Sequence, residues 1–595
     1  MFSTWDWCLA AAVTLLCVWA GDRWLSAPFA AQTGKPLRHG TLLACCLIAA
    51  GTALRLLAML RMGESALLPE EIETAVQARS LWLSGKSLEG HPWPAMLPGL
   101  SAEGNGSLLT WLAMPLLALT GLAGFSQRLP MLLVQALGLY ALWRTLRDAL
   151  SPRAALWALG IAAVSPWALL QSGWAQSWAL LPHLLMLAIW LFTRPCRRTA
   201  CLLGGAILLA LAMYTGDTAW FVAPLFVTAA LAVLWARKAV TWRQTLAALG
   251  VWALVAAPAL GAWTAQTFHL PGHTVLGMYV EATERYPHNS DWVTQDVKWD
   301  DDWHGNQDWW PRERELRGRD PHIARLYEDV LSNLYRGVLT VAMQNVEDPA
   351  SAVAVLDPEQ GFLYLCSLPL MLLGAVRLLS RLLARRKRSP AAGTLWALWG
   401  CLAGAALCFL LLHMRLAPAH YGVLFYPAVL LVAAGASYIA RRLRFAGLPL
   451  AAVYAVALGL LLARTPDLGP TYPGLSDALA YAAAMDTPKT VVTTRLYPND
   501  NPGRAAALQA IRAYGLDPAY VRGETQTPGQ LPYAERFSYI YFPSYTQGFA
   551  SDAAYVLYGS EAEQVDPAGF REIITFGEYA VLLPLADPTA AEDAP

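Results

Sequence analysis

Long apolar stretches separated by short polar turns occupy most of the chain. A helix needs about 20 apolar residues to cross the hydrocarbon core of a membrane. A shorter stretch, 108–121, contains Pro115 and fits a full span, a re-entrant segment or an interfacial helix. The pattern therefore predicts a mostly α, polytopic transmembrane helix bundle with about 12–13 spans. The stretches long enough to span lie near 7–24, 40–60, 129–146, 154–170, 178–193, 199–214, 218–236, 245–266, 361–380, 394–412, 421–439 and 446–463.

The pattern changes near residue 465, where apolar and polar positions begin to follow the periods of a soluble protein. Residues 490–494 and 537–542 are predicted strands, 504–514 a helix, and 573–583 a pair of strands. We therefore divide the chain into a transmembrane domain, 1–464, and a small soluble α/β domain, 465–595. The final residues, 587–595, are expected to be frayed.

Composition supports a membrane protein. Of the 595 residues, 56% are hydrophobic and 14% are charged, whereas a soluble domain carries about 25% charge. The formal net charge of zero gives no indication of nucleic-acid binding. The nine cysteines lie in apolar segments or beside arginine-rich turns, so neither a disulfide framework nor a zinc site is expected. Residues 1–20 lack a basic start, which favours a first span over a cleaved signal peptide.

Basic residues in the short turns predict the orientation, because such residues stay on the cytoplasmic side. All of the basic clusters face the cytoplasm if 108–121 does not fully cross. The loops 61–107 and 267–360, three short turns and the C-terminal domain then lie outside, which predicts an external active site. The five clusters contain Arg144, Arg147 and Arg153; Arg194, Arg197 and Arg198; Arg237, Lys238 and Arg243; Arg381 with 385–388; and Arg441, Arg442 and Arg444.

Three glutamates, Glu70, Glu71 and Glu73, follow Pro69 where the second span leaves the membrane. Carboxylates at the mouth of a membrane bundle carry a free-energy cost, so we expect these glutamates to have a functional role. If 69–84 is a helix, Glu71 is turned about 100° away from Glu70. The ordinary alternative is a helix start, because proline and glutamate both suit the first turn. On that helix, Glu70 would share a face with Glu73, Thr74 and Gln77.

Several motifs along residues 40–440 resemble the GT-C glycosyltransferases. They are similar in particular to the bacterial branch (glycosyltransferase family 39-like) of protein O-mannosyltransferases and the aminoarabinose transferase. The spacing of the motifs carries the resemblance more than any one of them. The motifs are Glu70-Glu71, then Gly85-Lys86-Ser87, Gly90 and Pro94; Gly124 to Pro130, which contains Arg128-Leu129-Pro130; Ser165-Pro166-Trp167 with Gln171-Ser172; Asn345 with Val355-Leu356-Asp357-Pro358 and Gly361; and His420-Tyr421 with Pro427.

The resemblance implies an enzyme of the bacterial cytoplasmic (inner) membrane that moves a sugar from a polyprenyl-phosphate carrier. The acceptor would be a protein, lipid or glycan on the outer face. Such transfer needs a base for the acceptor hydroxyl and stabilisation of the phosphate leaving group. Glu70 occupies the position of the family's first carboxylate, an aspartate, and is the candidate base, with Glu71 in a supporting role.

Some positions depart from the family pattern. Gly173, Trp220 and Tyr421 stand where the resemblance calls for arginine, and Ser177 stands near an expected acidic position. The loss of these cations leaves open a different donor geometry, a different substrate or a protein that does not catalyse.

The remaining polar residues of the outer turns supply candidates for substrate binding. Lys86, Arg79, Arg415 and His420 are candidates to hold phosphate. The alternatives are an interfacial role for Arg415, whose head group can reach lipid, and a structural role for His420. Asp217 fits either the cap of the following span or a second carboxylate that steers an acceptor or binds a metal.

The long loop 267–360 mixes aromatic and acidic side chains. Trp303 and Trp309, like Trp292, Trp299 and Trp310, suit stacking on sugar rings while neighbouring carboxylates accept hydroxyl hydrogens. The alternatives are a divalent cation bound through oxygens beside His304 and a tryptophan belt at the membrane interface. The acidic residues are Asp291, Asp296, Asp300, Asp301, Asp302 and Asp308.

Three alternative functions are compatible with the sequence. The first is a membrane glycosyltransferase that uses a polyprenyl-phosphate sugar. The second is a non-catalytic relative that binds lipid-linked glycan, and the third is a polysaccharide ligase, polymerase or transporter. Transporters are expected to carry charges at mid-membrane depth and duplicated halves, whereas the polar residues here are predicted to gather at span ends.

Overall fold

The structure is a computed structural model in which helices dominate. It describes residues 39–62, 69–97, 105–120, 128–149, 152–172, 176–194, 199–268, 270–281, 362–383, 390–412, 418–443, 445–464, 474–485, 487–493, 502–528, 530–540, 542 and 548–585. The predicted first span, 7–24, and most of the long loop lie outside these residues.

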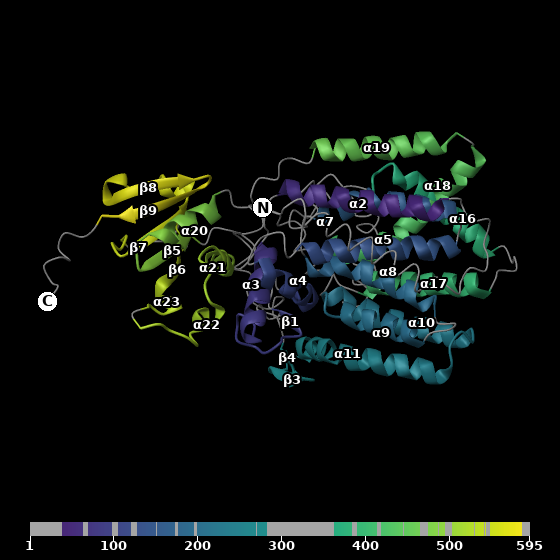
Figure 1. Cartoon of the computed structure of the whole chain (residues 1–595), viewed down its shortest axis with the longest axis horizontal. Helices are drawn as coiled ribbons and strands as arrows, with labels where there is room; N and C mark the ends of the chain where they lie inside the picture. Colours follow the sequence, from purple (N-terminus) through teal and green to yellow (C-terminus); the bar gives the residue numbers. More distant parts are fainter. Residues whose placement is uncertain are drawn as a thin grey trace, which may run out of the picture.

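The helices of the bundle run along the long axis of the molecule (Figure 1). They pack around one core of small and aromatic side chains, including Ala158, Trp167 and Phe226, which are all fully buried. The helices are α2 (Gly40–Met62), α5 (Leu129–Ala149), α6 (Pro152–Ala163), α7 (Pro166–Ser172), α8 (Leu181–Phe192), α9 (Thr199–Ala212), α10 (Asp217–Ala236), α11 (Trp242–Phe268), α16 (Ser367–Leu383), α17 (Pro390–Leu412), α18 (Phe425–Arg442) and α19 (Gly447–Arg464).

Within the described residues, five helices are long and apolar enough to cross a membrane, and six apolar helices are shorter. The predicted helical membrane bundle with a C-terminal mixed-sheet domain is therefore confirmed, and the chain has the helices of a multi-pass membrane protein. The number of crossings, about 12–13 on the sequence pattern, stays a prediction. The five long spans are Gly40–Leu60, Leu129–Arg147, Thr218–Ala236, Trp242–Ala265 and Tyr421–Arg442.

Two helices and two short hairpins cover one end of the bundle (Figure 1). Helix α3 (Pro69–Ser84) has the bounds predicted for it, and α4 is Ser107–Thr120. The hairpins are β1 (Met96–Leu97) with β2 (Asn105–Gly106), and β3 (His273–Val275) with β4 (Met278–Val280).

Helix α4 starts at this end of the bundle, and the chain after it lies at the same end. The Ser107 hydroxyl donates to the Ala95 carbonyl at 2.6 Å, and the Leu108 amide donates to the Tyr214 carbonyl at 3.1 Å. Arg128, which follows α4, bonds Glu71 on α3. With 14 residues, α4 is shorter than the about 20 that a crossing needs. That 108–121 does not fully cross, the condition under which the basic clusters share one side, stays a prediction.

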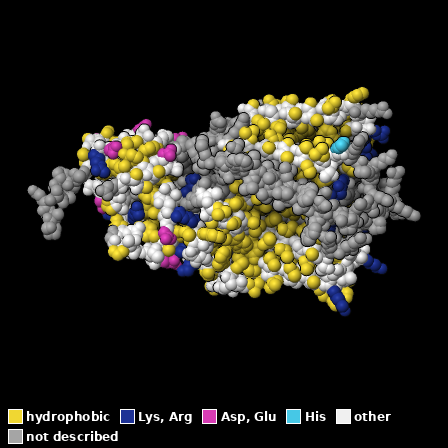
Figure 2. Space-filling view, viewed as in Figure 1, with side chains coloured by type: hydrophobic (Ala, Val, Ile, Leu, Met, Phe, Trp, Pro, Cys, Tyr) yellow, Lys and Arg dark blue, Asp and Glu magenta, His cyan; other side chains and the backbone are white. Residues whose placement is uncertain are grey.

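Charged side chains are unevenly distributed over the surface. In the view of Figure 2, acidic and basic side chains both lie on and beside the C-terminal domain, whereas the Lys and Arg side chains at the opposite end of the bundle have no acidic ones visible among them. Helices α5, α10 and α18 end there, close to Arg147, Arg237 and Arg441. The orientation in the membrane and the identity of the membrane both stay predictions.

The C-terminal domain contains one five-stranded sheet, in the order β6-β5-β7-β9-β8. Strand β5 is parallel to β6 and β7, and β9 is antiparallel to β7 and β8. The predicted strands and helix are present as β5 (Lys489–Thr493), α21 (Pro502–Ala513), β6 (Phe537–Ile540), β8 (Phe570–Phe576) and β9 (Tyr579–Pro584). The sequence prediction missed the central strand β7 (Ala553–Tyr558) and α20 (Leu475–Ala484). The short helices α22 (Pro518–Val521), α23 (Tyr533–Arg536) and α24 (Gly559–Ala562) lie in the connections.

Candidate active site

Helix α3 is the centre of the candidate site. It begins at Pro69, whose missing amide hydrogen costs nothing at this position, and it ends at Gly85, where φ is +68°. Its side chains from Glu71 to Ala78 are all buried. A short helix buried on every side must have its acidic groups satisfied by the surrounding protein.

Glu71 is held by Arg128. The Arg128 Nε and Nη2 atoms donate to the two Glu71 carboxylate oxygens at 2.8 and 2.9 Å, and both side chains are buried. This two-pronged geometry is the strongest form of arginine–carboxylate bond. Both Glu71 oxygens are thus occupied by Arg128, an arrangement compatible with the supporting role that stays a prediction for Glu71.

The face of α3 that carries Glu70 also carries Glu73 and Gln77, as predicted. Glu73 is fully buried. The Gln77 amide nitrogen donates to both Glu89 oxygens at 3.1 and 3.0 Å, and its oxygen accepts from the Leu88 amide at 2.8 Å. The loop after α3 is thus folded back onto this face. Glu70 lies in the first turn of the helix, and its side chain is outside the described residues.

Arg79 and Lys86 contact the C-terminal domain. The Arg79 Nη2 atom donates to the Gly515 carbonyl at 3.1 Å, and the Lys86 ammonium pairs with Glu524 at 2.7 Å. Hydrogen bonds from Arg522 and Lys86 lower the pKa of Glu524 to about 2, so this carboxylate is ionised at neutral pH. The predicted role of these two cations in binding phosphate stays a prediction, because here both groups contact the C-terminal domain.

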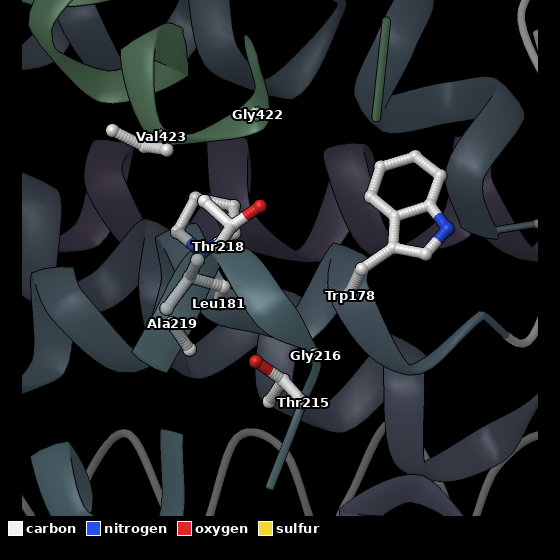
Figure 3. Close-up of a pocket in the computed structure, with 9 residues that line it drawn as sticks. Trp178, Leu181, Thr215, Gly216, Thr218, Ala219, Gly422 and Val423 are labelled. Atoms are coloured by element: carbon white, nitrogen blue, oxygen red, sulfur yellow. The ribbon is translucent and has the colours of Figure 1, made fainter. Parts of the chain in front are cut away.

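Three short turns enclose a small pocket (Figure 3). The Trp178 indole lies on one side of it, and the Thr215 and Thr218 side chains lie on the other. The α9–α10 turn lies against β2. The backbones approach so closely at Gly106 that a Cβ added there would overlap the Tyr214 and Thr215 backbone. The pocket is lined by Trp178, Leu181, Pro182, Thr215, Gly216, Thr218, Ala219, Gly422 and Val423.

Asp217 and His420 belong to two of these turns. Asp217 is the first residue of α10, between the pocket residues Gly216 and Thr218. His420 lies in the 3-10 segment η4 (Pro418–Leu424), two residues before Gly422. The fold therefore brings the two backbone positions to one pocket, while both side chains are outside the described residues.

The other candidates fall outside the described residues. They are Arg415, Trp303 and Trp309, together with the acidic residues around His304. Among the side chains that the structure describes, no three His, Cys, Asp or Glu residues are grouped as a metal site. The proposed divalent cation of the long loop therefore stays a prediction.

Arg55 is a buried cation that the sequence analysis missed. It lies inside the first long span, and its Nη2 and Nη1 atoms donate to the Ala162 and Ala163 carbonyls at 3.0 and 3.1 Å. Its Nε atom donates to Gln135 on α5 at 2.9 Å. The Ala162 carbonyl would bond the amide four residues on, but that residue is Pro166, which has no N–H.

Arg55 thus donates the hydrogen bond that the Ala162 carbonyl lacks at the helix break. Inside a membrane, every backbone polar group needs such a partner from the protein. The proline after α6 was the signal in the sequence. Contrary to the prediction, polar residues are therefore not confined to the span ends, but this one has a structural use and gives no support to a transporter.

A second buried contact joins α8 to α18. The His183 Nδ1 atom and the Tyr426 hydroxyl are 2.7 Å apart, and both side chains are buried. Trp167 of α7 stacks near His183, with 6.4 Å between ring centroids, and packs on Phe425 at 4.8 Å. These contacts connect the Ser165-Pro166-Trp167 motif with the segment around Pro427.

Comparison with known proteins gives similar folds but no family. The chain matches no protein-family profile and no curated protein. Among solved structures, the oligosaccharyltransferase of Archaeoglobus fulgidus, in complex with zinc and sulfate, is 15% identical with a TM-score of 0.43. That match covers 77% of this chain and 61% of that protein, so the chain spans about three-fifths of its length.

The ArnT protein of Cupriavidus metallidurans is similar over more of its length. Its apo structure is 14% identical with a TM-score of 0.40, and the match covers 89% of this chain and 96% of that protein. Its structure bound to undecaprenyl phosphate is 15% identical with a TM-score of 0.41, and the match covers 92% and 98%. At these values the likeness assigns no reaction to the chain.

Proposed function

We propose that the chain is an integral-membrane glycosyltransferase that moves a sugar from a polyprenyl-phosphate donor to an acceptor on the outer face. The observation that carries the proposal is the meeting of motif segments far apart in the sequence. Glu71 bonds Arg128 of the Arg-Leu-Pro motif, and Trp167 packs on Phe425 beside the His420-Tyr421 motif. These are the segments on which the GT-C resemblance depends.

In the proposed reaction, a hydroxyl oxygen of the acceptor attacks the sugar carbon that carries the phosphate. The bond between that carbon and the phosphate oxygen breaks, and the polyprenyl phosphate leaves with the electron pair. Glu70 takes the hydroxyl proton. Glu71 and Arg128 fix the first turn of α3, so that Glu70 is presented from a rigid element rather than from a loop.

The test is turnover of a labelled polyprenyl-phosphate sugar by the purified full-length protein. Glu70→Gln keeps the size of the side chain and removes the base, so turnover should fall by about 100-fold or more. Glu563→Gln, an exposed residue of the C-terminal domain, is the matched control and should retain full activity. Unchanged turnover in Glu70→Gln would remove Glu70 from the mechanism.

A non-catalytic relative that binds lipid-linked glycan is the second candidate. It is favoured by the positions where the resemblance calls for arginine. Trp220 is buried, with its indole nitrogen donating to the Met213 carbonyl at 3.0 Å, and Tyr421 is buried as well. Two of the missing cations are thus replaced by packed aromatic side chains. Wild-type protein that binds polyprenyl-phosphate sugars but transfers none of them would establish this function instead.

A further inference from the structure

Helix α3 is shared between the membrane bundle and the C-terminal domain. On one side, Ala75 and Ala78 pack against Ala113 and Leu117 of α4. On another, Ile72 and Val76, each 1% exposed, belong to the same hydrophobic core as Leu479, Leu508 and Val556 of the C-terminal domain. The two parts of the chain are therefore joined by one helix, which packs against α4 on one side and belongs to the core of the C-terminal domain on another.

Arg522, which follows α22, fixes the end of α3 by hydrogen bonds. Its Nη1 atom donates to the Ser80 hydroxyl at 2.8 Å and to the Ser87 carbonyl at 3.1 Å. Its Nη2 atom donates to the Ser84 hydroxyl at 3.1 Å and to Glu524 at 2.9 Å. Its side chain is only 5% exposed, so water does not compete for these donors.

The position of this arginine suits the helix. The last turn of a helix carries partial negative charge, which a cation stabilises. Glu524 holds Arg522 on one oxygen and Lys86 on the other, so the bonds of the two cations support one another. On α3, Arg79 adds a hydrogen bond to the Gly515 carbonyl of the C-terminal domain.

Two guanidinium groups thus anchor the two ends of α3. Arg128 from the bundle holds the first turn through Glu71, and Arg522 from the C-terminal domain holds the last. The contact of α3 with α4 is made by Ala75 and Ala78 against Ala113 and Leu117, and such apolar side chains supply no directional bond against a shift or turn of the helix. Any such movement would carry Glu70, which precedes Glu71, out of place.

We propose that the C-terminal domain acts as a clamp on α3 and that Arg522 is a positioning residue for the candidate base. This inference rests on the proposed function for the role of Glu70, but the clamp itself does not. Arg522 touches no substrate, so its effect on the reaction passes through the helix. The C-terminal domain thereby has a role, holding α3 in place, that no motif in its sequence indicates.

The experiment compares full-length wild type, Arg522→Ala, Arg522→Lys and the exposed control Arg571→Ala in detergent. Hydrogen exchange of the amides 72–84 is measured together with kcat and the KM for a polyprenyl-phosphate sugar. Arg522→Ala should raise exchange in 72–84 about ten-fold or more and lower kcat about ten-fold, with KM within about two-fold. Arg522→Lys should fall between, because one ammonium cannot reach all four oxygens.

Unchanged exchange of 72–84 in Arg522→Ala would overturn the clamp, whatever the turnover. Faster exchange with unchanged kcat would overturn the positioning role. If wild type transfers no sugar, the proposed function fails, and the exchange data still decide the clamp. Ser84→Ala, which removes one acceptor from the α3 side, gives the same reading in a smaller step should Arg522→Ala fail to fold.

Discussion

Single arginines hold together segments that lie far apart in the sequence. Arg55 bonds a side chain 80 residues away, Arg128 one 57 residues away and Arg522 one 442 residues away. Each satisfies groups that the local backbone leaves without a partner or a counter-charge. In a buried setting such bonds are strong, and the loss of one partner is costly.

The pair formed by Glu71 and Arg128 gives a prediction about stability. Glu71→Leu removes the carboxylate that faces a buried guanidinium, and we expect a loss of about 3 kcal/mol in the free energy of unfolding. Arg128→Leu should cost a similar amount. The double variant should cost clearly less than the sum, because both charges leave together.

Equilibrium unfolding of the purified variants measures these three costs. The Lys489–Asp552 pair is a suitable control, because its nitrogen and oxygen are 2.7 Å apart and both side chains are exposed. Its loss should change the free energy of unfolding by less than about 1 kcal/mol. Strictly additive costs at Glu71 and Arg128 would contradict the prediction.

Helices approach one another most closely where glycine faces a neighbouring backbone. A Cβ on Gly435 of α18 would overlap the Leu370 carbonyl of α16, and a Cβ on Gly374 of α16 would overlap the Leu431 carbonyl. Small residues permit this kind of contact between membrane helices, where no hydrophobic effect drives association. The pairing of α16 with α18 therefore depends on two positions.

Gly435→Ala should force α16 and α18 apart and lower stability by about 1–3 kcal/mol. Gly459→Ala on α19 is the matched control, because a Cβ there meets no described atom within 4 Å. It should be neutral or slightly stabilising, since alanine favours helix. Thermal unfolding in detergent compares the two, and equal midpoints would contradict the packing argument.

The sequence predicted most elements but few of their contacts. Long apolar stretches located most bundle helices within a few residues, because burial in a membrane demands long apolar helices, and Pro69 and Gly85 marked the ends of α3. It ran across the break at Pro166, so 154–170 was predicted as one span where α6 and α7 are two helices. Strand β7 was missed because its buried run has no alternation to mark it.

The candidate site followed the same rule. Glu70 and Glu71 were recognised from their place after Pro69, which is local information. The partners of Glu71, Arg79 and Lys86 were not foreseen, because a sequence does not say which distant residue folds onto a helix. Arg522 lies in a turn of the C-terminal domain that no motif distinguishes.

At the scale of the whole molecule, the bundle has one end with basic turns and one end with α3 and the C-terminal domain. This arrangement predicts the accessibility of single cysteines placed in a cysteine-free variant. Arg237→Cys and Glu563→Cys are both at exposed positions, one at each end. An impermeant maleimide applied from outside the cytoplasmic membrane should label Glu563→Cys and leave Arg237→Cys unlabelled. The reverse pattern would place the candidate site in the cytoplasm.

The two faces of α3 acquire their packing partners at different times during translation. The acidic end of α3 leaves the ribosome early, while Arg522 and the strands that cover Ile72 and Val76 are translated last. Until then, the partner surface of this helix does not exist. A chain interrupted between the long loop and the C-terminal domain would therefore carry every candidate acid and still lack the finished site.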